Sequence, residues 1–432
     1  MQPRRLAVTA ALALGLLAPA SASAARVGTD GLANEPAART ARAAATTAGE
    51  PNLVDQWALT DRAMGIITAW RQVTGGDVTV AVLDSGINLR HRDLAPNLWS
   101  NPGEVPGNGV DDDHNGYVDD VNGWDFVAAD GDPSDENGHG THVAGIIGAR
   151  GDNRVGGSGV AQQVRLMSVR VLDRNAGGTT DVVAKGIRYA VDNGARIVNL
   201  SLAGPAATQD LKGAIDYAAA RGVLVVAAAG NDSSDLGSRP AYPVSFPEDN
   251  LIGVAATDSA LKLADISNYG PGADVAAPGA DILSTAMDGG YEWRTGTSMA
   301  APAVAGTLAL IASARPDLDA AGLRDALYNG VTRGSLPVTY GSVNAAGALR
   351  GVIAADAWKD APATAAAAPK GQLRTAVQTP GAVTRTAAQR AAIAKAARAR
   401  AGKRCKAVRK RVHGKTVKTL RCTRAKSAKR RK

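Results

Sequence analysis

Apolar, β-branched segments alternate with helical stretches along this chain, and that alternation limits the folds open to it. The expected strands are residues 78–83, 164–171, 196–202, 223–229, 251–256 and 274–277. Expected helices at 182–193 and 210–221 separate some of these strands. Strands connected through helices pair in parallel, and a parallel sheet needs helices over both of its faces. The sequence therefore predicts an α/β domain with a parallel β-sheet covered by helices on both faces.

Three polar motifs lie where such a sheet carries its functional groups. Asp84 ends the strand in Val-Ala-Val-Leu-Asp-Ser-Gly, residues 80–86, and His139 lies in Asn-Gly-His-Gly-Thr-His, residues 137–142. Ser298 lies in Gly-Thr-Ser-Met-Ala-Ala-Pro-Ala, residues 296–303, just before an apolar run that predicts a buried helix. Unpaired N–H groups and the positive end of a helix dipole would face this serine, and both stabilise developing negative charge. An acid, a histidine and a serine in this chain order are typical of a catalytic triad.

Each residue also has a purely structural interpretation. Asp-Ser-Gly is a common turn and resembles the aspartic-peptidase motif, but no second Asp-Ser-Gly or Asp-Thr-Gly occurs in the chain. His139 could cap a helix, Ser298 could be an N-cap, and Asn231, which ends the apolar strand at 223–229 after a glycine, could be a turn residue. The four together, in one order, favour catalysis over four unrelated structural uses.

These motifs resemble those of the subtilases, the subtilisin-like serine peptidases, over roughly residues 51–355. The resemblance implies that Asp84 orients His139, that His139 is the general base and acid, and that Ser298 is the nucleophile. It implies that Asn231 donates its side-chain amide to the oxyanion. The segment Ser201, Leu202, Ala203 and Gly204 would form one wall of the substrate cleft, with an alanine where the family usually has glycine. A secreted endopeptidase of broad specificity is expected.

An acidic stretch between Asp84 and His139 predicts a structural calcium site. Residues 111–136 hold ten acidic side chains and no lysine or arginine. Crowded carboxylates repel each other unless a cation intervenes, and their spacing here partly matches an EF-hand-like loop. The expected ligands are Asp111, Asp113, Asn115, Asp119 and Asp120, and the alternative is a solvated acidic loop. The subtilase pattern implies a second, weaker candidate at Asp93 and Asn153, with Asp55 as the alternative for its N-terminal ligand.

The two ends of the chain predict secretion and a separate tail. Residues 1–24 read as a signal peptide with an Ala-Ser-Ala cleavage site, and residues 25–50 as a short disordered leader. Because this leader replaces the folded propeptide of many subtilases, calcium is expected to drive folding. Residues 356–402 form an Ala-rich linker, and residues 403–432 a basic tail.

The tail carries the positive charge of the chain. Residues 401–432 hold 15 Lys and Arg and no acid, so the remaining 34 basic and 40 acidic residues give residues 1–400 a formal charge of −6. Cys405 and Cys422 predict one disulfide across a β-hairpin with its turn near Gly414. Such a hairpin could hold an anionic cell-surface polymer or nucleic acid, or be a solvated extension.

Two functions from different classes follow. The first is an active secreted endopeptidase, a monomer without a membrane span, and the intact set of site residues favours it. The second is an adhesive protein whose peptidase fold carries the basic tail. A zinc peptidase is disfavoured because the chain has no His-Glu-x-x-His pair.

Overall fold

A computed structural model describes residues 26–28, 39–40, 50–359, 403–412 and 415–424, with side chains for 50–359. The chain divides into two units, residues 1–361 and 362–432. The expected signal peptide and nearly all of the expected linker lie outside the described residues.

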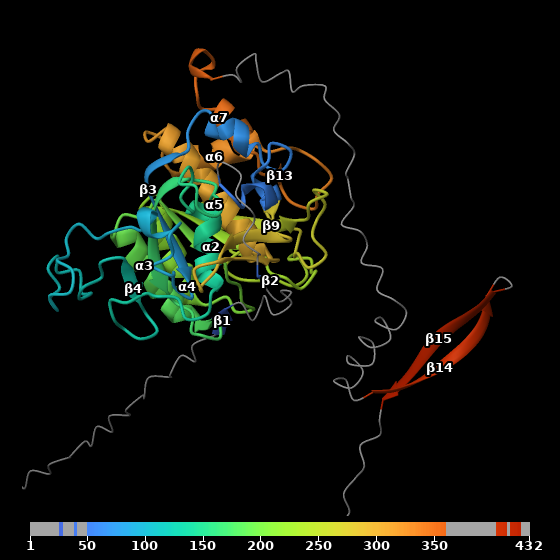
Figure 1. Ribbon diagram of the computed structural model, residues 1–432. Coiled ribbons are helices and arrows are strands. Elements are labelled where there is room, and N and C mark those ends of the chain that lie inside the picture. The colour runs from blue at the N-terminus through green and yellow to red at the C-terminus, as the bar shows by residue number, and fades with distance from the viewer. Residues whose placement is uncertain (1–25, 29–38, 41–49, 360–402, 413–414, 425–432) are drawn as a thin grey trace, which may run out of the picture. The chain divides into compact units, whose positions relative to one another are not determined.

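The first unit is built on an eight-stranded sheet whose neighbouring strands all pair in parallel (Figure 1). The strand order is β13-β10-β9-β8-β7-β3-β5-β4. The strands are β3 (Gly75–Asp84), β4 (Gly123–Asp125), β5 (Gln163–Arg170), β7 (Ile197–Leu200), β8 (Leu224–Ala228), β9 (Leu251–Thr257), β10 (Val275–Pro278) and β13 (Gly341–Ser342).

Alternate side chains of the central strand β3 enter two separate hydrophobic cores. Val80 and Val82 pack in one core, while Ala81 and Leu83 pack in the other, as the period of two requires. The first core lies under α1 (Ile66–Trp70), α2 (His139–Gly148), α5 (Thr297–Ala314), α6 (Ala320–Gly330) and α7 (Ala345–Arg350). The second lies under α3 (Thr180–Asp192) and α4 (Gln209–Ala220). The predicted parallel sheet with both faces covered is confirmed.

Helix α5 packs against the sheet and is buried along nearly its whole length. Its apolar residues leave no polar face, because the helix contacts β3, β7, β8, β9 and β10 on one side and other helices on the other. Among the described residues it alone is long and apolar enough to span a membrane, and 89% of it is buried inside the domain. A core helix passes that test equally well.

Two small antiparallel sheets adjoin the large one and were not expected from the sequence. One contains β11 (Ile282–Thr285), β12 (Tyr291–Arg294) and β2 (Arg39–Thr40), and the other pairs β1 (Arg26–Gly28) with β6 (Gly177–Thr179). Strands β1 and β2 belong to the segment that composition alone predicted to be disordered. They form because partners distant in sequence offer unpaired strand edges, which local composition does not report.

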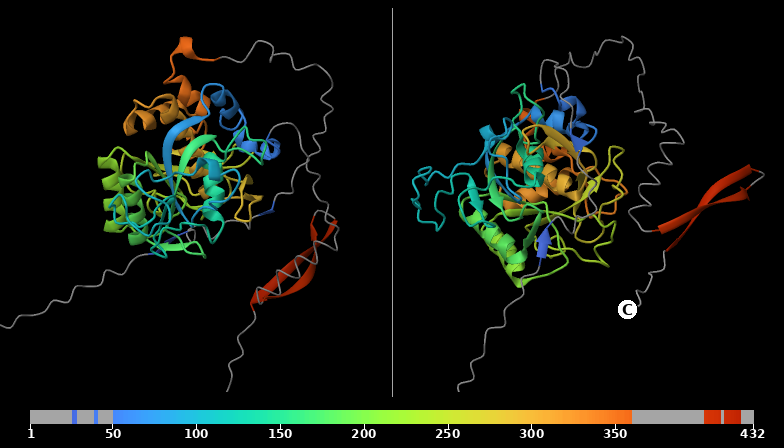
Figure 2. Two further views of the ribbon diagram at one scale, coloured as in Figure 1. Left: turned by 60° about the vertical axis from the view of Figure 1, so that its left-hand side comes forward. Right: turned by 60° about the horizontal axis from the view of Figure 1, so that its bottom comes forward.

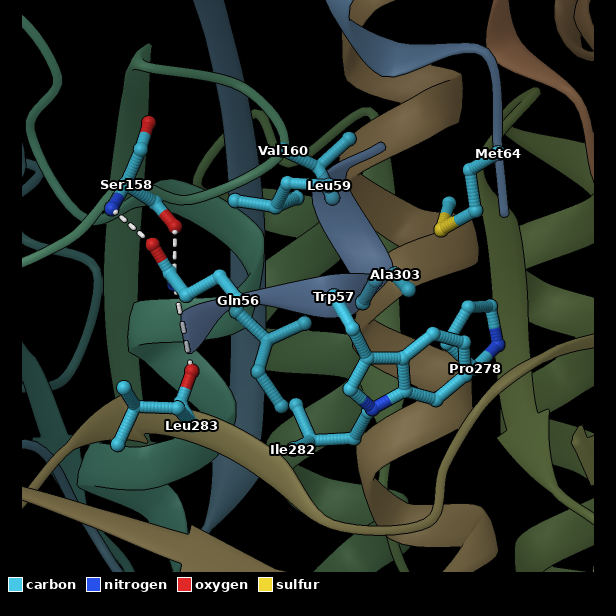
Figure 3. A pocket seen from close by; sticks show the side chains of 12 residues that line it. Gln56, Trp57, Leu59, Met64, Ser158, Val160, Pro278, Ile282, Leu283 and Ala303 are labelled. Carbon is cyan, nitrogen blue, oxygen red and sulfur yellow. Dashed lines mark hydrogen bonds between the residues drawn. The ribbon is translucent and has the colours of Figure 1, made fainter. Parts of the chain in front are cut away.

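The segment that follows the leader is held against α5 and β11. It includes the 3₁₀ turns η2 (Leu53–Asp55) and η3 (Trp57–Leu59). Figure 3 shows Gln56 between two backbone segments: its Nε2 donates to the carbonyl of Ser158 at 2.9 Å and that of Leu283 at 3.3 Å. Beside it, Met64, Val160 and Ala303 help to line an apolar pocket of about 20 Å³, enough for about one water molecule.

The second unit contains a β-hairpin. Strands β14 (Lys403–Val412) and β15 (Lys415–Arg424) pair antiparallel, and Cys405 lies directly opposite Cys422. This register brings the two cysteines to adjacent positions, as a cross-strand disulfide requires. The disulfide itself stays a prediction.

Candidate active site

Asp84 is held at the carboxyl end of β3, in a turn that only a small residue can follow. The side chain is fully buried, and the N–H of Ser85 donates to its Oδ1 at 2.7 Å. Gly86 has φ +108°, and a Cβ there would lie 2.7 Å from the carbonyl oxygen of Pro133. The chain therefore turns away sharply and leaves the carboxylate facing the next element.

That element is α2, which begins at His139. The Nδ1 of His139 lies 2.8 Å from Oδ1 and 3.0 Å from Oδ2 of Asp84, and the histidine is 2% exposed. A carboxylate accepts hydrogen bonds, so this contact assigns the proton to Nδ1 and leaves Nε2 as the basic nitrogen of the neutral ring. A Cβ at Gly140 would lie 2.1 Å from the carbonyl oxygen of Gly86, so glycine there permits the close approach of helix and strand.

Asp135 ties these two segments together, a role that its position in the sequence did not indicate. Its Oδ1 accepts from Ser85 Oγ at 2.8 Å and from the N–H of Gly138 at 2.9 Å. Its Oδ2 accepts from the N–H of Thr141 at 2.9 Å and from Thr141 Oγ1 at 2.5 Å. An acid four residues before a glycine-bracketed histidine is the signal that could have found it, because a carboxylate suits the first turn of a helix.

Ser298 is the second residue of α5 and is fully buried. Its Oγ donates to the carbonyl of Ser201 at 3.2 Å, and Ser201 Oγ donates back to the carbonyl of Ser298 at 2.8 Å. Hydrogen bonds therefore join Ser201 of the expected cleft segment to Ser298, the expected nucleophile. Leu202, Ala203 and Gly204 follow Ser201 as buried residues, and Gly204 pairs with Tyr242 through two backbone hydrogen bonds.

Asn231 lies beside the residue that precedes Ser298. Its Oδ1 accepts from the N–H of Thr297 at 2.9 Å and from Thr297 Oγ1 at 3.0 Å. Since the oxygen end of the amide is occupied by acceptor bonds, the orientation of the side-chain NH₂ group is fixed by this network. Asn231 is 1% exposed, so its amide lies in a water-poor setting.

The neighbouring histidine, His142, has a structural role and does not belong to the candidate triad. Its Nε2 lies 3.2 Å from the carbonyl of Ile282 and 3.1 Å from that of Glu292. Burial lowers the pKa of His142 well below its ordinary value, so the ring is neutral and donates to these carbonyls.

The acidic loop brings together only part of the expected calcium set. Carboxylate oxygens of Asp111, Asp113 and Glu104 lie within 4.8 Å of one another. Glu104 precedes the acidic stretch, so sequence spacing gave no reason to include it. An all-oxygen donor set of this kind suits calcium.

The other expected ligands contact protein groups. Asp119 accepts from the N–H groups of Gly107 and Gly109 at 2.7 and 2.8 Å, and its side chain closes that loop. Asp120 is fully buried and accepts from Tyr189 Oη at 2.6 Å, and burial raises the pKa of its carboxyl. Asn115 donates through Nδ2 to Asp113 and Asp120, both at 3.1 Å.

The second candidate site gains a residue that the sequence analysis did not name. Asp93 accepts from Asn153 Nδ2 at 2.9 Å and from Tyr291 Oη at 2.6 Å, and burial raises the pKa of Asp93. Glu50 Oε1 accepts from the N–H of Asn153 at 2.7 Å, while Glu50 Oε2 is buried without a hydrogen-bond partner in the described structure. Glu50 therefore brings a carboxylate from the N-terminal segment to this loop, and Asp55 as a ligand stays a prediction.

Comparisons with known proteins agree with this geometry. The family model described as "Subtilase family" matches residues 75–348. The chain is 40% identical over 280 residues to thermitase of Thermoactinomyces vulgaris, covering 64% of this chain and 90% of that protein. It is 43% identical over 246 residues to a thermophilic serine proteinase of Bacillus sp. (strain AK1), covering 57% of this chain but only 55% of that longer protein.

Solved structures give the same result. A cold-adapted subtilisin-like serine proteinase superposes with a TM-score of 0.52 at 33% identity, covering 63% of this chain and 88% of that one. A protease of Pseudoalteromonas arctica superposes with a TM-score of 0.60 at 31% identity, covering 71% and 99%. Because the family model matches more than half of the chain, this chain belongs to the subtilase family of serine peptidases.

Proposed function

We propose that this chain is an endopeptidase that hydrolyses peptide bonds in proteins through Asp84, His139 and Ser298. The observation that carries the proposal is the buried hydrogen bond of 2.8 Å between His139 Nδ1 and Asp84. That contact keeps Nε2 basic and stabilises the imidazolium that forms when it takes a proton. Placement of Ser298 in the first turn of α5 supports its role as the nucleophile.

Acylation begins when Ser298 Oγ attacks the carbonyl carbon of the bond to be cut. His139 Nε2 takes the serine proton, and the carbonyl oxygen becomes an oxyanion. Asn231 Nδ2–H and the backbone N–H of Ser298 donate to it, and donors placed in advance stabilise this charge more than solvent does. His139 then gives the proton to the departing amine, which leaves an acyl-enzyme.

Deacylation repeats these roles with water. His139 takes a proton from the water that attacks the ester, and returns it to Ser298 Oγ as the new carboxylate leaves. A substrate strand laid along residues 201–204 would bind through backbone hydrogen bonds, which are insensitive to side chains. Broad specificity follows from that mode of binding.

We further propose that calcium stabilises the fold without joining the chemistry. Glu104, Asp111 and Asp113 would hold one ion, and Glu50, Asp93 and Asn153 would hold another. A bound ion supplies stability because it binds the folded chain and not the unfolded one. The buried oxygen of Glu50 and the convergence of three carboxylates support these assignments.

Secretion, a monomeric state and attachment to an anionic cell-surface polymer complete the proposal. The hairpin β14–β15 supports attachment, because its register places Lys406 opposite Arg421 and Arg409 opposite Lys418. Two paired strands this rich in lysine and arginine attract a polyanion. An adhesive role for the tail is thus the second candidate function, compatible with the first.

Casein hydrolysis by the full chain and by Ser298→Ala tests the proposal. Removal of the nucleophile is expected to lower kcat by at least about 10⁴-fold. A chelator should abolish activity slowly, with recovery on added calcium, if the ions stabilise the fold. Equal cleavage by the variant and the parent chain would refute the role of Ser298.

A further inference from the structure

A row of three charged residues crosses the sheet where strands β3, β5 and β4 end. These strands are neighbours at one edge of the sheet, on the side where the loop ahead of β4 projects (Figures 1 and 2). Arg170 pairs in register with Asp84 on β3 and with Asp125 on β4. Leu83 and Val169, one position earlier, both enter the second core, so the row faces α2 on the opposite side. Arg170 is therefore the middle member of an acid–base–acid row that starts at the acid of the candidate triad.

The guanidinium of Arg170 joins β4 to the turn that leads into α2. Its Nη1 donates to Asp125 Oδ2 at 2.6 Å, and its Nη2 donates to Glu136 Oε2 at 2.5 Å. Glu136 lies three residues before His139 in this turn. The next residue, Asn137, accepts through Oδ1 from the N–H of His139 at 3.2 Å. Arg170 thus holds the turn that presents the histidine, from the strand beside the one that presents Asp84.

Asp125 gives this guanidinium a fixed anchor. Asp125 is 1% exposed, and its Oδ1 accepts from the N–H groups of Val127 at 2.6 Å and Ala128 at 2.9 Å. With three donors on its carboxylate, Asp125 has little freedom to move. A planar guanidinium bonded to such a carboxylate is itself fixed, so its second prong holds Glu136 in one place.

Stability alone does not account for a cation at position 170. Arg170 is 6% exposed, and its Nε–H is buried without a hydrogen-bond partner in the described structure. Removing an ion from water costs free energy, and an unpaired buried donor adds to that cost. A well-packed apolar side chain would avoid both costs. What it would not supply is a two-pronged contact to acids on separate segments.

We propose that Arg170 is a positioning residue for the reaction, which fixes the turn before His139 relative to the strand end that carries Asp84. The inference rests on the proposed peptidase function and adds a residue that acts through Glu136 and not on the substrate. Without the guanidinium, the turn loses its tie to β5, and the imidazole is held less accurately between Asp84 and Ser298. A displacement of about 1 Å at a catalytic group lowers the rate by about 100-fold.

The first test compares kcat and KM of Arg170→Met with those of the parent chain on one peptide substrate. Methionine fills much of the space and removes both prongs. We expect kcat per active site to fall by about 10- to 100-fold with KM within about twofold, because the reaction and not substrate binding needs the imidazole in place. Arg165→Met is the matched control: this exposed arginine lies on the same strand and pairs with exposed Asp77 at 2.9 Å. The control should match the parent.

A double-mutant cycle separates positioning from a general loss of stability. The side chain of Glu136 is 48% exposed, so Glu136→Gln should fold. We expect this change to lower kcat, and the double variant with Arg170→Met to lose no more than Arg170→Met alone, because both changes break the same contact. Arg170→Lys, which keeps the charge but not the fork, should retain more of kcat than Arg170→Met. Thermal unfolding of every chain ensures that rates are measured well below the lowest Tm.

A folded Arg170→Met chain with the kcat of the parent would overturn the proposal, and so would losses in the double variant that simply multiply. If Arg170→Met does not fold, a parent-like kcat for Glu136→Gln overturns it instead. Ser298→Ala, measured beside these chains, distinguishes the two possible failures. Cleavage by Ser298→Ala at the parent rate would refute the proposed function, whereas an inactive Ser298→Ala with unchanged Arg170 and Glu136 variants would refute only the role of Arg170.

Discussion

At the scale of single residues, the site is held by carboxylates with different tasks. Asp84 contacts His139 directly, whereas Asp135 contacts only the backbone and hydroxyl groups that place the two triad-bearing segments. Asp135 is therefore a positioning residue. Its effect reaches the chemistry through the separation of strand β3 and helix α2.

Replacing Asp135 with Asn is expected to lower kcat by up to about 100-fold with little change in KM, since a displacement of about 1 Å has an effect of that size. Asp132→Asn, an exposed carboxylate three residues earlier, is the control and should leave kcat unchanged. Steady-state kinetics on one peptide substrate checks both. A parent-like kcat for Asp135→Asn would show that the hydrogen bonds to the Asp135 carboxylate are not needed to position the catalytic segments.

Asn231→Ala removes a proposed oxyanion donor. We expect kcat to fall by about 100- to 1000-fold while KM stays near the parent value, because the hydrogen bond forms in the transition state. Thermal unfolding should accompany the kinetics, since Asn231 also accepts from Thr297. A change confined to KM would argue against the oxyanion role.

Titration of Asp274, which lies away from the triad, is expected to make the stability of the fold depend on pH. Burial raises the pKa of Asp274 from 3.8 to about 6, although the N–H of Gly253 donates to its Oδ2 at 2.8 Å. The folded chain favours the neutral acid. The contribution of Asp274 to the free energy of unfolding is therefore fully present below about pH 4 and is lost as pH rises through 6. Asp274→Asn should raise the free energy of unfolding at pH 8 by at most about 3 kcal/mol, and Tm with it, but should raise neither at pH 4. Equal Tm differences at both pH values would rule out this titration.

At the scale of elements, α5 combines close packing with the nucleophile. Gly306 faces α2 and the chain after it: a Cβ there would lie 2.7 Å from Val160 Cβ and 3.1 Å from the carbonyl of Ile147. Position 306 requires glycine because Val160 and the carbonyl of Ile147 lie so close to it, and not because of its backbone conformation. The position of Ser298 therefore depends on a contact two turns along the helix.

Gly306→Ala should destabilise the domain by about 1–3 kcal/mol through overpacking, despite the better helix propensity of alanine. Gly213→Ala in α4 is the matched control, because its Cβ would meet only Arg188 Nη2 at 3.6 Å. That variant should be neutral or more stable by up to about 1 kcal/mol. Denaturant unfolding of both distinguishes packing from propensity.

At the scale of the whole molecule, the two proposed calcium sites join segments distant in sequence. Glu50 and Asn153 are separated by 103 residues, and Glu104 lies outside the acidic run that it meets. A chelator should lower Tm. Calcium at about 100 times Kd should restore about 2.7 kcal/mol of the free energy of unfolding. In Glu50→Gln and Asp111→Asn this calcium-dependent gain should shrink. A Tm independent of calcium in the parent chain would refute both sites.

The division into two units predicts that the tail is dispensable for catalysis. A chain ending at Lys359 should keep kcat/KM within about twofold of the full chain, because the proposed triad and cleft residues lie in the first unit. Binding to vesicles or polymers of high negative charge should be lost, and should weaken with salt in the full chain. Retained binding by the shortened chain would refute the role of the tail.

The sequence by itself determined the parallel sheet, six of its eight strands to within a few residues, and the order of the candidate triad, whereas the short edge strands β4 and β13 were not expected. These follow from local patterns: hydrophobic periodicity, glycine-led turns and polar residues at strand ends are properties of adjacent residues. Only the tertiary structure decided that Asp135 fixes the α2 start, that Glu104 and Glu50 join the acidic groups, and that β1 pairs with β6 and β2 with β12. Those contacts connect residues far apart in the chain, whose proximity is set by how the packed elements meet and not by any local preference.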